Sequence, residues 1–120
     1  MKQSLNLIKE PFGSSSNKTP QYLTFHRTFK REFTKHLLGI GCKDIQFHKP
    51  NHFDVSGFFT GPNNRTFYFS IGDLRWNKER IMIRTASHYK DYSGGSNYYY
   101  NIDETLGAKV ANHVDEHDIE

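Results

Sequence analysis

Cysteine and long apolar runs are nearly absent from this 120-residue chain. Cys42 is the only cysteine, which excludes an intramolecular disulfide and fits a reducing cytoplasm. The apolar patch at Leu5, Leu7 and Ile8 is interrupted at Lys9, and no segment approaches the roughly 20 apolar residues of a membrane-spanning helix. These absences predict a cytoplasmic protein with no signal-peptide core and no membrane partner.

Aliphatic residues are also scarce, whereas aromatic residues are abundant. Only 35% of the residues are hydrophobic, but ten Phe and seven Tyr help to bring the aromatic share to 15%. Each buried ring removes a large area from water, so we expect aromatic side chains to supply much of the core. A chain of this length is typical of one domain.

Charge is distributed unevenly along the chain. Residues 1–50 carry nine Lys/Arg against three Asp/Glu, residues 51–100 carry six against four, and residues 101–120 carry one against six. The first hundred residues thus form a basic body, which favours an anionic partner, and the C-terminal segment is acidic. The plain alternative is that the charge only keeps the protein in solution.

A long amphipathic helix is predicted from Thr19 as N-cap and Pro20 as first helical residue, up to the glycines at 39 and 41. Its apolar stripe, with one residue in every four, consists of Phe25, Phe29, Phe33 and Leu37. Basic residues with the same spacing on another side are Arg27, Arg31 and Lys35. That basic line is either an ordinary solvated face or a contact surface.

Four strands are predicted next, at residues 44–49, 52–60, 65–72 and 80–86, because apolar and polar residues alternate there and turn residues separate them. The predicted fold class is therefore α+β: an N-terminal amphipathic helix, an antiparallel four-stranded meander sheet and a short C-terminal helix. We expect one domain over residues 19–114, a flexible segment at 1–18 and a frayed acidic tail at 115–120. Residues 87–101 are predicted as a loop rich in Tyr and Gly, with a short strand at Tyr98–Tyr100 as an alternative.

Two surfaces are predicted to carry function, together with the basic side of the first helix. Aromatic and Arg side chains on the outward face of the sheet suit single-stranded nucleic acid, because bases stack on rings and cations meet phosphates. The Tyr-rich loop is the second surface. The candidate nucleic-acid-binding residues are Arg27, Arg31, Lys35, Phe58, Tyr68, Arg80, Arg84, His88, Tyr89, Lys90 and Tyr92. The alternative is that the last helix or the Tyr98–Tyr100 segment covers the outward face, so that Phe58 and Tyr68 form a second small core.

Motifs for metal, cofactor or covalent chemistry are weak. His113 and His117 are four residues apart on the last helix, but zinc needs a third ligand, so neither a metal site nor a cofactor is predicted. Cys42 follows a helix end, whose dipole raises rather than lowers a thiol pKa. A metal-dependent nuclease remains an alternative, with candidate residues Asp54, Asp73, Glu79 and Lys90.

Four stretches of the chain resemble a family of small uncharacterised proteins of bacterial phages and mobile elements. They are Thr28–Phe33, Phe67–Arg75, Ile83–Ala86 and the Lys90–Asn97 loop with the sequence KDYSGGSN. The resemblance covers roughly residues 19–97 and carries over no catalytic residue. It implies the cytoplasm of a bacterial host, where such proteins often handle nucleic acid or block host defences.

These observations lead to three hypotheses. The first is a small, non-enzymatic nucleic-acid-binding accessory protein of a phage or mobile element, with DNA or RNA as partner. The second is a protein that binds and inhibits a host defence or nuclease complex, with its acidic tail mimicking nucleic acid. The third is the metal-dependent nuclease. The oligomeric state is left open by the sequence.

Overall fold

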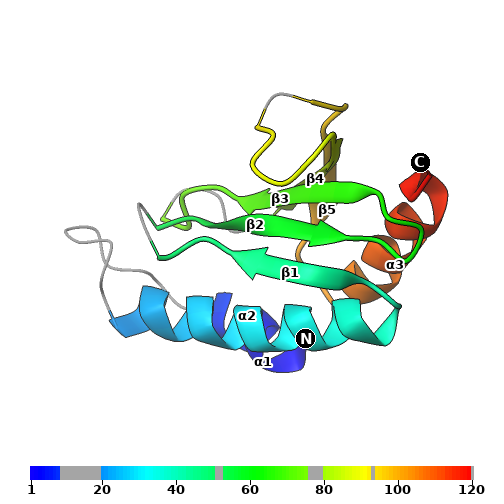
Figure 1. Ribbon diagram of the computed structural model, residues 1–120. Coiled ribbons are helices and arrows are strands. Elements are labelled where there is room, and N and C mark those ends of the chain that lie inside the picture. Colours follow the sequence, from blue (N-terminus) through cyan, green and yellow to red (C-terminus); the bar gives the residue numbers. More distant parts are fainter. Residues whose placement is uncertain (9–19, 51–52, 76–79, 93, 120) are drawn as a thin grey trace.

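The computed structural model describes residues 1–8, 20–50, 53–75, 80–92 and 94–119. The elements in these ranges, in chain order, are α1 (Lys2–Ile8), α2 (Pro20–Gly39), β1 (Lys43–Phe47), β2 (Val55–Thr60), β3 (Thr66–Ile71), β4 (Arg80–Ala86), β5 (Tyr98–Asn101) and α3 (Leu106–His117) (Figure 1). The strands form one antiparallel sheet in the order β1-β2-β3-β4-β5. The α+β class and the antiparallel meander are thus confirmed.

The prediction of four strands is wrong, because the described sheet has five. Ile83 of β4 pairs with Tyr98 and Arg80 pairs with Asn101, so β5 closes one edge of the sheet. The connection between β4 and β5 is long. It lacks the short turn sequence that predicts the pairing of β2 with β3. Three consecutive tyrosines, which favour a strand, were the only local signal.

A second correction concerns the N-terminal segment, where Lys2–Ile8 is a helix instead of a flexible chain. The Glu32 carboxylate on α2 accepts hydrogen bonds from the backbone N–H groups of Gln3 and Ser4, at 3.2 and 2.8 Å, and from Ser4 Oγ at 2.6 Å. Backbone N–H groups in the first turn of a helix have no internal partner and favour negative charge, so Glu32 fixes α1 on α2. Ile8 then enters the core. Residues 9–19, including the predicted N-cap Thr19, lie outside the described residues.

The contact between α1 and α2 should depend on pH. Burial acts to raise the pKa of Glu32, but the hydrogen bonds from Ser4 and Gln3 outweigh it and hold the pKa below its ordinary value of 4.5. A carboxylate with a lowered folded-state pKa stabilises the fold above its unfolded pKa, and this contribution disappears as pH falls through the folded value. We therefore expect α1 to leave α2 at a pH below 4.5. Amide resonances of Gln3 and Ser4, followed by NMR through an acid titration, measure this.

The Glu32→Gln variant supplies the control for this pH dependence. It keeps the shape of the side chain but loses the charge, so its Gln3 and Ser4 amides should show the loosened state at neutral pH already. An acid transition of the same midpoint and size in Glu32→Gln would contradict the assignment to Glu32.

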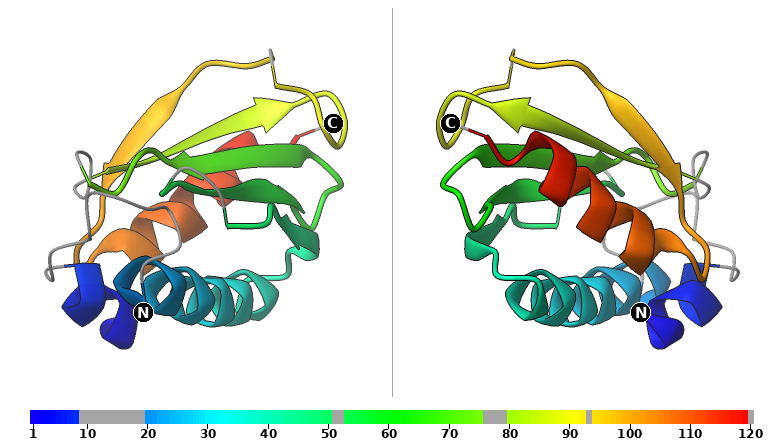
Figure 2. Two further views of the ribbon diagram at one scale, coloured as in Figure 1. Left: turned by 90° about the vertical axis from the view of Figure 1, so that its left-hand side faces the viewer. Right: turned by 90° about the vertical axis from the view of Figure 1, so that its right-hand side faces the viewer.

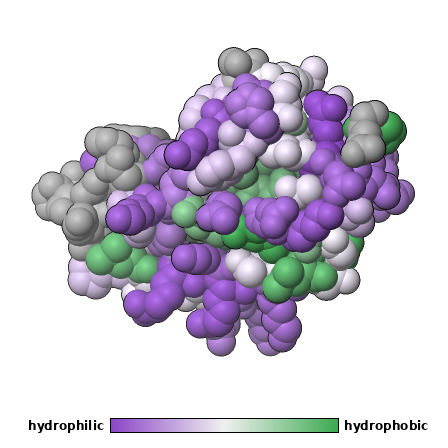
Figure 3. All heavy atoms as spheres, viewed as in Figure 1, coloured by the Kyte–Doolittle hydropathy of each residue, from purple (hydrophilic) through white to green (hydrophobic). Residues whose placement is uncertain are grey.

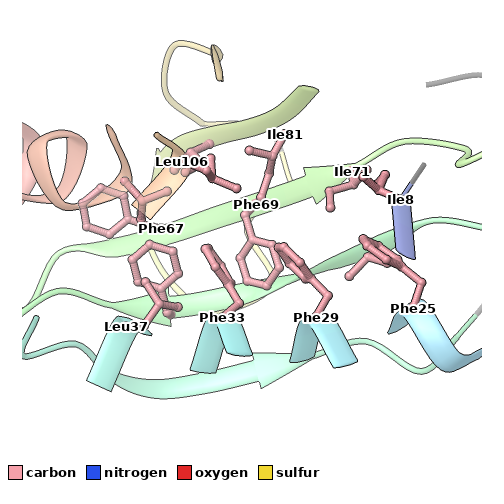
Figure 4. Packing of buried hydrophobic residues seen from close by; sticks show 14 of the residues in the cluster. Ile8, Phe25, Phe29, Phe33, Leu37, Phe67, Phe69, Ile71, Ile81 and Leu106 are labelled. Atoms are coloured by element: carbon pink, nitrogen blue, oxygen red, sulfur yellow. The ribbon is translucent and has the colours of Figure 1, made fainter. Parts of the chain in front are cut away.

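The predicted apolar stripe of α2 is confirmed, and it forms the centre of the core. Phe25, Phe29, Phe33 and Leu37 point from α2 toward the inner face of the sheet (Figure 4), and each is fully buried. Phe29 and Phe33 stack with ring centroids 4.9 Å apart, and Phe33 meets Phe69 of β3 edge to face at 5.1 Å. Helix α3 covers the same face beside α2 (Figure 2), through Leu106, Val110 and Val114.

The acidic tail is a third correction, since α3 continues to His117 and the next residue is part of the fold. Asp118 is buried, and its carboxylate accepts hydrogen bonds from the backbone N–H of Asn63 at 2.6 Å and of Arg65 at 3.1 Å. Both donors belong to the turn between β2 and β3. A Cβ atom on Gly61 would lie 2.4 Å from the Asp118 carboxyl carbon, so only a glycine at this position leaves room for the Asp118 side chain. In the parts of the chain that the structure describes, no helix has the length and apolar character needed to cross a membrane.

Candidate nucleic-acid interface

The candidate residues on the sheet and those on α2 lie on opposite faces of the molecule. Residues that alternate along a strand point to opposite sides. Phe59 and Phe69 point inward and contact Phe33 of α2, whereas Phe58 and Tyr68 point outward and contact Tyr92 of the loop. In Figure 1 this loop lies at the top and α2 at the bottom. The structure therefore presents two separate candidate surfaces.

The outer face of the sheet carries an aromatic cluster formed by His48, Phe58, Tyr68, Tyr89 and Tyr92. Phe58 is its centre, with ring centroids 5.0 Å from Tyr68, 5.2 Å from Tyr89 and 5.5 Å from Tyr92. Only 1% of Phe58 is exposed, although the sequence predicts an open stacking platform there. The loop between β4 and β5 covers the face, so the predicted exposure of Phe58 is wrong. The covering segment is neither the last helix nor Tyr98–Tyr100, which were the two segments considered in the alternative, but the loop that contains Tyr89 and Tyr92.

His48 joins this cluster by polar contacts as well. Its Nδ1 lies 2.9 Å from Ser56 Oγ, and its Nε2 lies 3.3 Å from the Tyr92 hydroxyl. These two contacts connect β2, the segment after β1 and the loop. The rings of the outer cluster are thus held by hydrogen bonds as well as by packing, as expected for a second small core.

Arg84 is the residue that organises the loop. Its guanidinium lies 4.7 Å from the centroid of the Tyr68 ring and donates hydrogen bonds to the carbonyl oxygens of Gly94, at 2.6 Å, and Asp91, at 2.9 Å. Only 4% of Arg84 is exposed, so the prediction of a solvent-facing cation is wrong. The outward direction of the side chain was predicted correctly, but its donors are used by the chain itself.

The packing of the loop explains why glycine occupies positions 94 and 95. Gly95 has φ = +75°, and a Cβ atom there would lie 2.4 Å from the carbonyl oxygen of Thr85. A Cβ atom on Gly94 would lie 2.6 Å from Asp91 Oδ2, which accepts a hydrogen bond from the Ser87 N–H at 2.9 Å. The Gly-Gly pair therefore lets the loop close over β4.

The remaining loop candidates are exposed. Tyr89 and Tyr92 are 47% and 57% exposed, although the ring of each also contacts Phe58 in the outer cluster. Lys90 has φ = +71°, and its Nζ lies 5.6 Å from the Tyr89 ring centroid. His88 Nδ1 lies 2.8 Å from the carbonyl oxygen of Tyr89. Arg80 lies away from the loop, at the β5 edge, with its guanidinium 5.1 Å from the Tyr99 ring centroid.

The second candidate surface is the basic face of α2, which consists of Arg27, Lys30, Arg31 and Lys35. All four side chains are exposed, as predicted for the three residues proposed from sequence. They border a shallow groove of about 510 Å³ that also includes Thr34 and Leu38. Figure 3 shows hydrophilic side chains gathered along the lower edge of the molecule, where α2 lies in Figure 1.

A second hollow extends the basic face toward α1. It has a volume of about 840 Å³ and lies between the two helices, where Lys2 joins Arg31 and Lys35. Arg31 also donates a hydrogen bond to the side-chain carbonyl of Gln3. Lys2 was missed by the sequence reading because residues 1–18 were expected to be flexible, and only the docking of α1 brings it here.

The only acidic residue of α2, Glu32, lies beside this face and lines the second hollow together with Arg31 and Lys35. Its carboxylate is turned to α1 and accepts three hydrogen bonds from Gln3 and Ser4. The basic face thus consists of four cations on one helix surface without an anion among them. Clustered like charges of this kind raise the local concentration of anionic partners.

The groups considered for catalysis do not form a metal-binding cluster among the described residues. Asp73 forms an ion pair with Arg75 at 2.5 Å, and Glu79 lies outside the described residues. Burial, together with the charge of Asp118, raises the pKa of the Cys42 thiol to about 11, so this cysteine is protonated at neutral pH. Within the described ranges no three His, Cys, Asp or Glu side chains gather in a way that could hold a metal ion.

Comparison with protein-family models, with curated proteins and with solved structures found no match.

Proposed function

We propose that this protein binds nucleic acid without catalysis, through contacts of the basic face of α2 with backbone phosphates. The observation that carries the proposal is the exposed row of Arg27, Lys30, Arg31 and Lys35, whose only acidic neighbour on the helix is engaged by α1. The setting we propose is that of a small accessory protein of a phage or mobile element, which the sequence resemblance implies.

The spacing of the cations supports contacts to phosphates. Arg27, Arg31 and Lys35 follow one another at intervals of four residues. With a rise of about 1.5 Å per residue, they are spaced by about 6 Å along the helix axis. Because the three cations lie along one side of the helix, they can reach phosphates along a short stretch of one backbone. Such contacts position a protein on the backbone but carry no sequence information, and we expect little sequence preference.

Salt dependence tests the proposal directly. Four phosphate contacts predict a slope of log K against log salt of about −3.6 on duplex DNA and about −2.8 on a single strand. The triple variant R27E/R31E/K35E should bind more than about 100-fold more weakly at low salt, because it loses three of the four cations and adds three anions. Fluorescence anisotropy with labelled duplex and single-stranded oligonucleotides measures both quantities.

The matched control is the triple variant R80E/K90E/K109E, which changes the net charge equally on exposed side chains elsewhere. It should keep most of the affinity if the α2 face makes the contacts. Equal losses of affinity in the two triple variants would show that only the net charge matters. A larger loss of affinity in the control would indicate that the interface lies at the β5 edge and the loop. No salt-dependent binding by the wild type would refute the proposal altogether.

The alternative hypothesis of nucleic-acid mimicry needs acidic side chains that are free for a partner at the C-terminus. Asp118, the last acidic residue of the described chain, is 2% exposed and holds the turn between β2 and β3. Part of the proposed mimic is therefore used by the fold. Asp115 and Glu116 of α3 remain exposed, but they are two acidic residues against the four cations of the basic face of α2, and we therefore propose that face as the interface.

A further inference from the structure

Two histidines of α3 pack against the tyrosines of β5. His113 and His117 are one helical turn apart, and their ring centroids are separated by 4.4 Å. Tyr98 lies 5.1 Å from His113 and 4.8 Å from His117, between ring centroids. This group of three is completed by Tyr100, whose hydroxyl is 2.6 Å from His113 Nδ1. The cluster lies far along the chain from the basic face of α2 and is not used by the proposed function.

One ring nitrogen of this cluster has no explanation within the fold. His113 is 1% exposed, and among the described residues its Nε2 has neither a hydrogen-bond partner nor contact with solvent. A buried polar atom without a partner costs free energy, and a bound water or ion is one explanation for such an atom in a native protein. The neighbouring rings of Phe67 and Tyr98, at 5.7 and 5.1 Å, offer an aromatic surround.

The contact with Tyr100 suits a metal ion at this nitrogen in one of the two neutral tautomers of His113. When His113 Nδ1 donates its proton to the Tyr100 oxygen, the lone pair of the ring lies on Nε2. Histidines that bind metals are commonly oriented in this way, with the second nitrogen held by an oxygen acceptor.

We propose that His113 Nε2 and the His117 imidazole form a two-histidine site for a divalent transition-metal ion of the Zn²⁺, Cu²⁺ or Ni²⁺ class. Residues four apart on a helix lie on one face, and imidazole nitrogens favour these ions over Mg²⁺ or Ca²⁺. The side chain of His117 is 27% exposed, which gives an ion a path from solvent to the buried His113. Water completes the coordination, so the site is an exchangeable one and differs from closed structural zinc sites with four protein ligands.

The experiment uses the full chain without an affinity tag, stripped with EDTA and titrated with ZnCl₂ in a calorimeter. We expect one Zn²⁺ per chain, a rise in Tm with added zinc, and zinc-induced shifts of the ring protons of His113 and His117 in NMR spectra. The H117Q variant replaces a partly exposed ligand and should lose the binding and the Tm rise. The H88A variant, which removes an exposed histidine outside the cluster, should retain both.

The second ligand is tested with H113F, which preserves an aromatic ring in the buried position. A folded H113F protein that binds no zinc supports the site. Zinc binding that survives in H117Q, or that H88A abolishes, overturns the assignment to this pair. Absence of stoichiometric binding in the wild type overturns the proposal and leaves a buried water as the partner of His113 Nε2. Since these readouts do not involve nucleic acid, they are independent of the proposed function.

Discussion

Replacing Phe33 by alanine should reduce the free energy of unfolding by about 3–5 kcal/mol, as is typical of a fully buried Phe replaced by Ala. Phe33 is completely buried, and its ring lies 4.9 Å from Phe29, 5.1 Å from Phe69, and 6.4 Å from both Phe47 and Phe59, between centroids. Its removal leaves a cavity where α2 meets β1, β2 and β3. A domain of this size has about 5–15 kcal/mol of stability in total, so the loss is a large fraction.

Urea denaturation followed by circular dichroism measures the effect. The matched control is Leu38→Ala on the same helix, where the side chain is 59% exposed and the change should stay within about 0.5 kcal/mol. A cost below about 1 kcal/mol for Phe33→Ala, or equal costs for the two variants, would contradict the central position of this ring. It would also place the core elsewhere than under the α2 stripe.

The parts of the fold that were predicted correctly have local causes. The stripe of Phe25, Phe29, Phe33 and Leu37 reflects the helical period, which neighbouring residues alone produce. The inner and outer faces of β2, β3 and β4 were assigned correctly, because alternation along a strand is likewise a local property.

The differences all arise from contacts between residues distant in the chain. Glu32 captures the start of α1 across 28 or 29 residues, and Asp118 holds a turn that lies 53 to 55 residues earlier. Neither carboxylate differs from a surface acid in its local sequence. A partner of this kind becomes visible only when the elements are packed, because the free N–H groups it satisfies belong to another part of the chain.

The two candidate surfaces likewise combine features that the local sequence predicts with features that depend on the packing of distant segments. The exposed cations of α2 follow from the helical pattern, and their exposure was predicted. The outer face of the sheet was assigned correctly to Phe58, Tyr68 and Arg84, but a pattern of alternation does not say which segment covers a face. Here the loop between β4 and β5 returns over the sheet, and Arg84 binds its carbonyl oxygens.

Arg84 holds the loop between β4 and β5, so its replacement should lower the stability of the protein substantially. We expect Arg84→Met to lower the free energy of unfolding by about 2–4 kcal/mol, because the loop loses charge-assisted hydrogen bonds and its carbonyls lose their donors. Methionine retains much of the apolar length of the side chain beside Tyr68, so the loss isolates the guanidinium. Hydrogen exchange of residues 87–97 should increase more than that of β2 and β3, and urea denaturation should give the loss in stability.

Arg80→Met on the same strand is the control, because Arg80 is exposed and its guanidinium lies over Tyr99 outside the loop. Its effect should stay within about 0.5 kcal/mol. Unchanged loop protection in Arg84→Met would show that the aromatic cluster alone holds the loop.

The same variant separates the two surfaces functionally. If phosphates are bound by the basic face of α2, Arg84→Met should bind nucleic acid as the wild type does at temperatures where it is folded, because its guanidinium donates to the chain's own carbonyls. If the outer face of the sheet binds bases instead, Arg84→Met should bind single strands more tightly than the wild type. Opening the loop would uncover Phe58 and Tyr68, and each base that stacks on a ring contributes about 1–3 kcal/mol to binding. A gain of affinity on single strands, without one on duplexes, would therefore transfer the interface from α2 to the sheet and make the loop its cover.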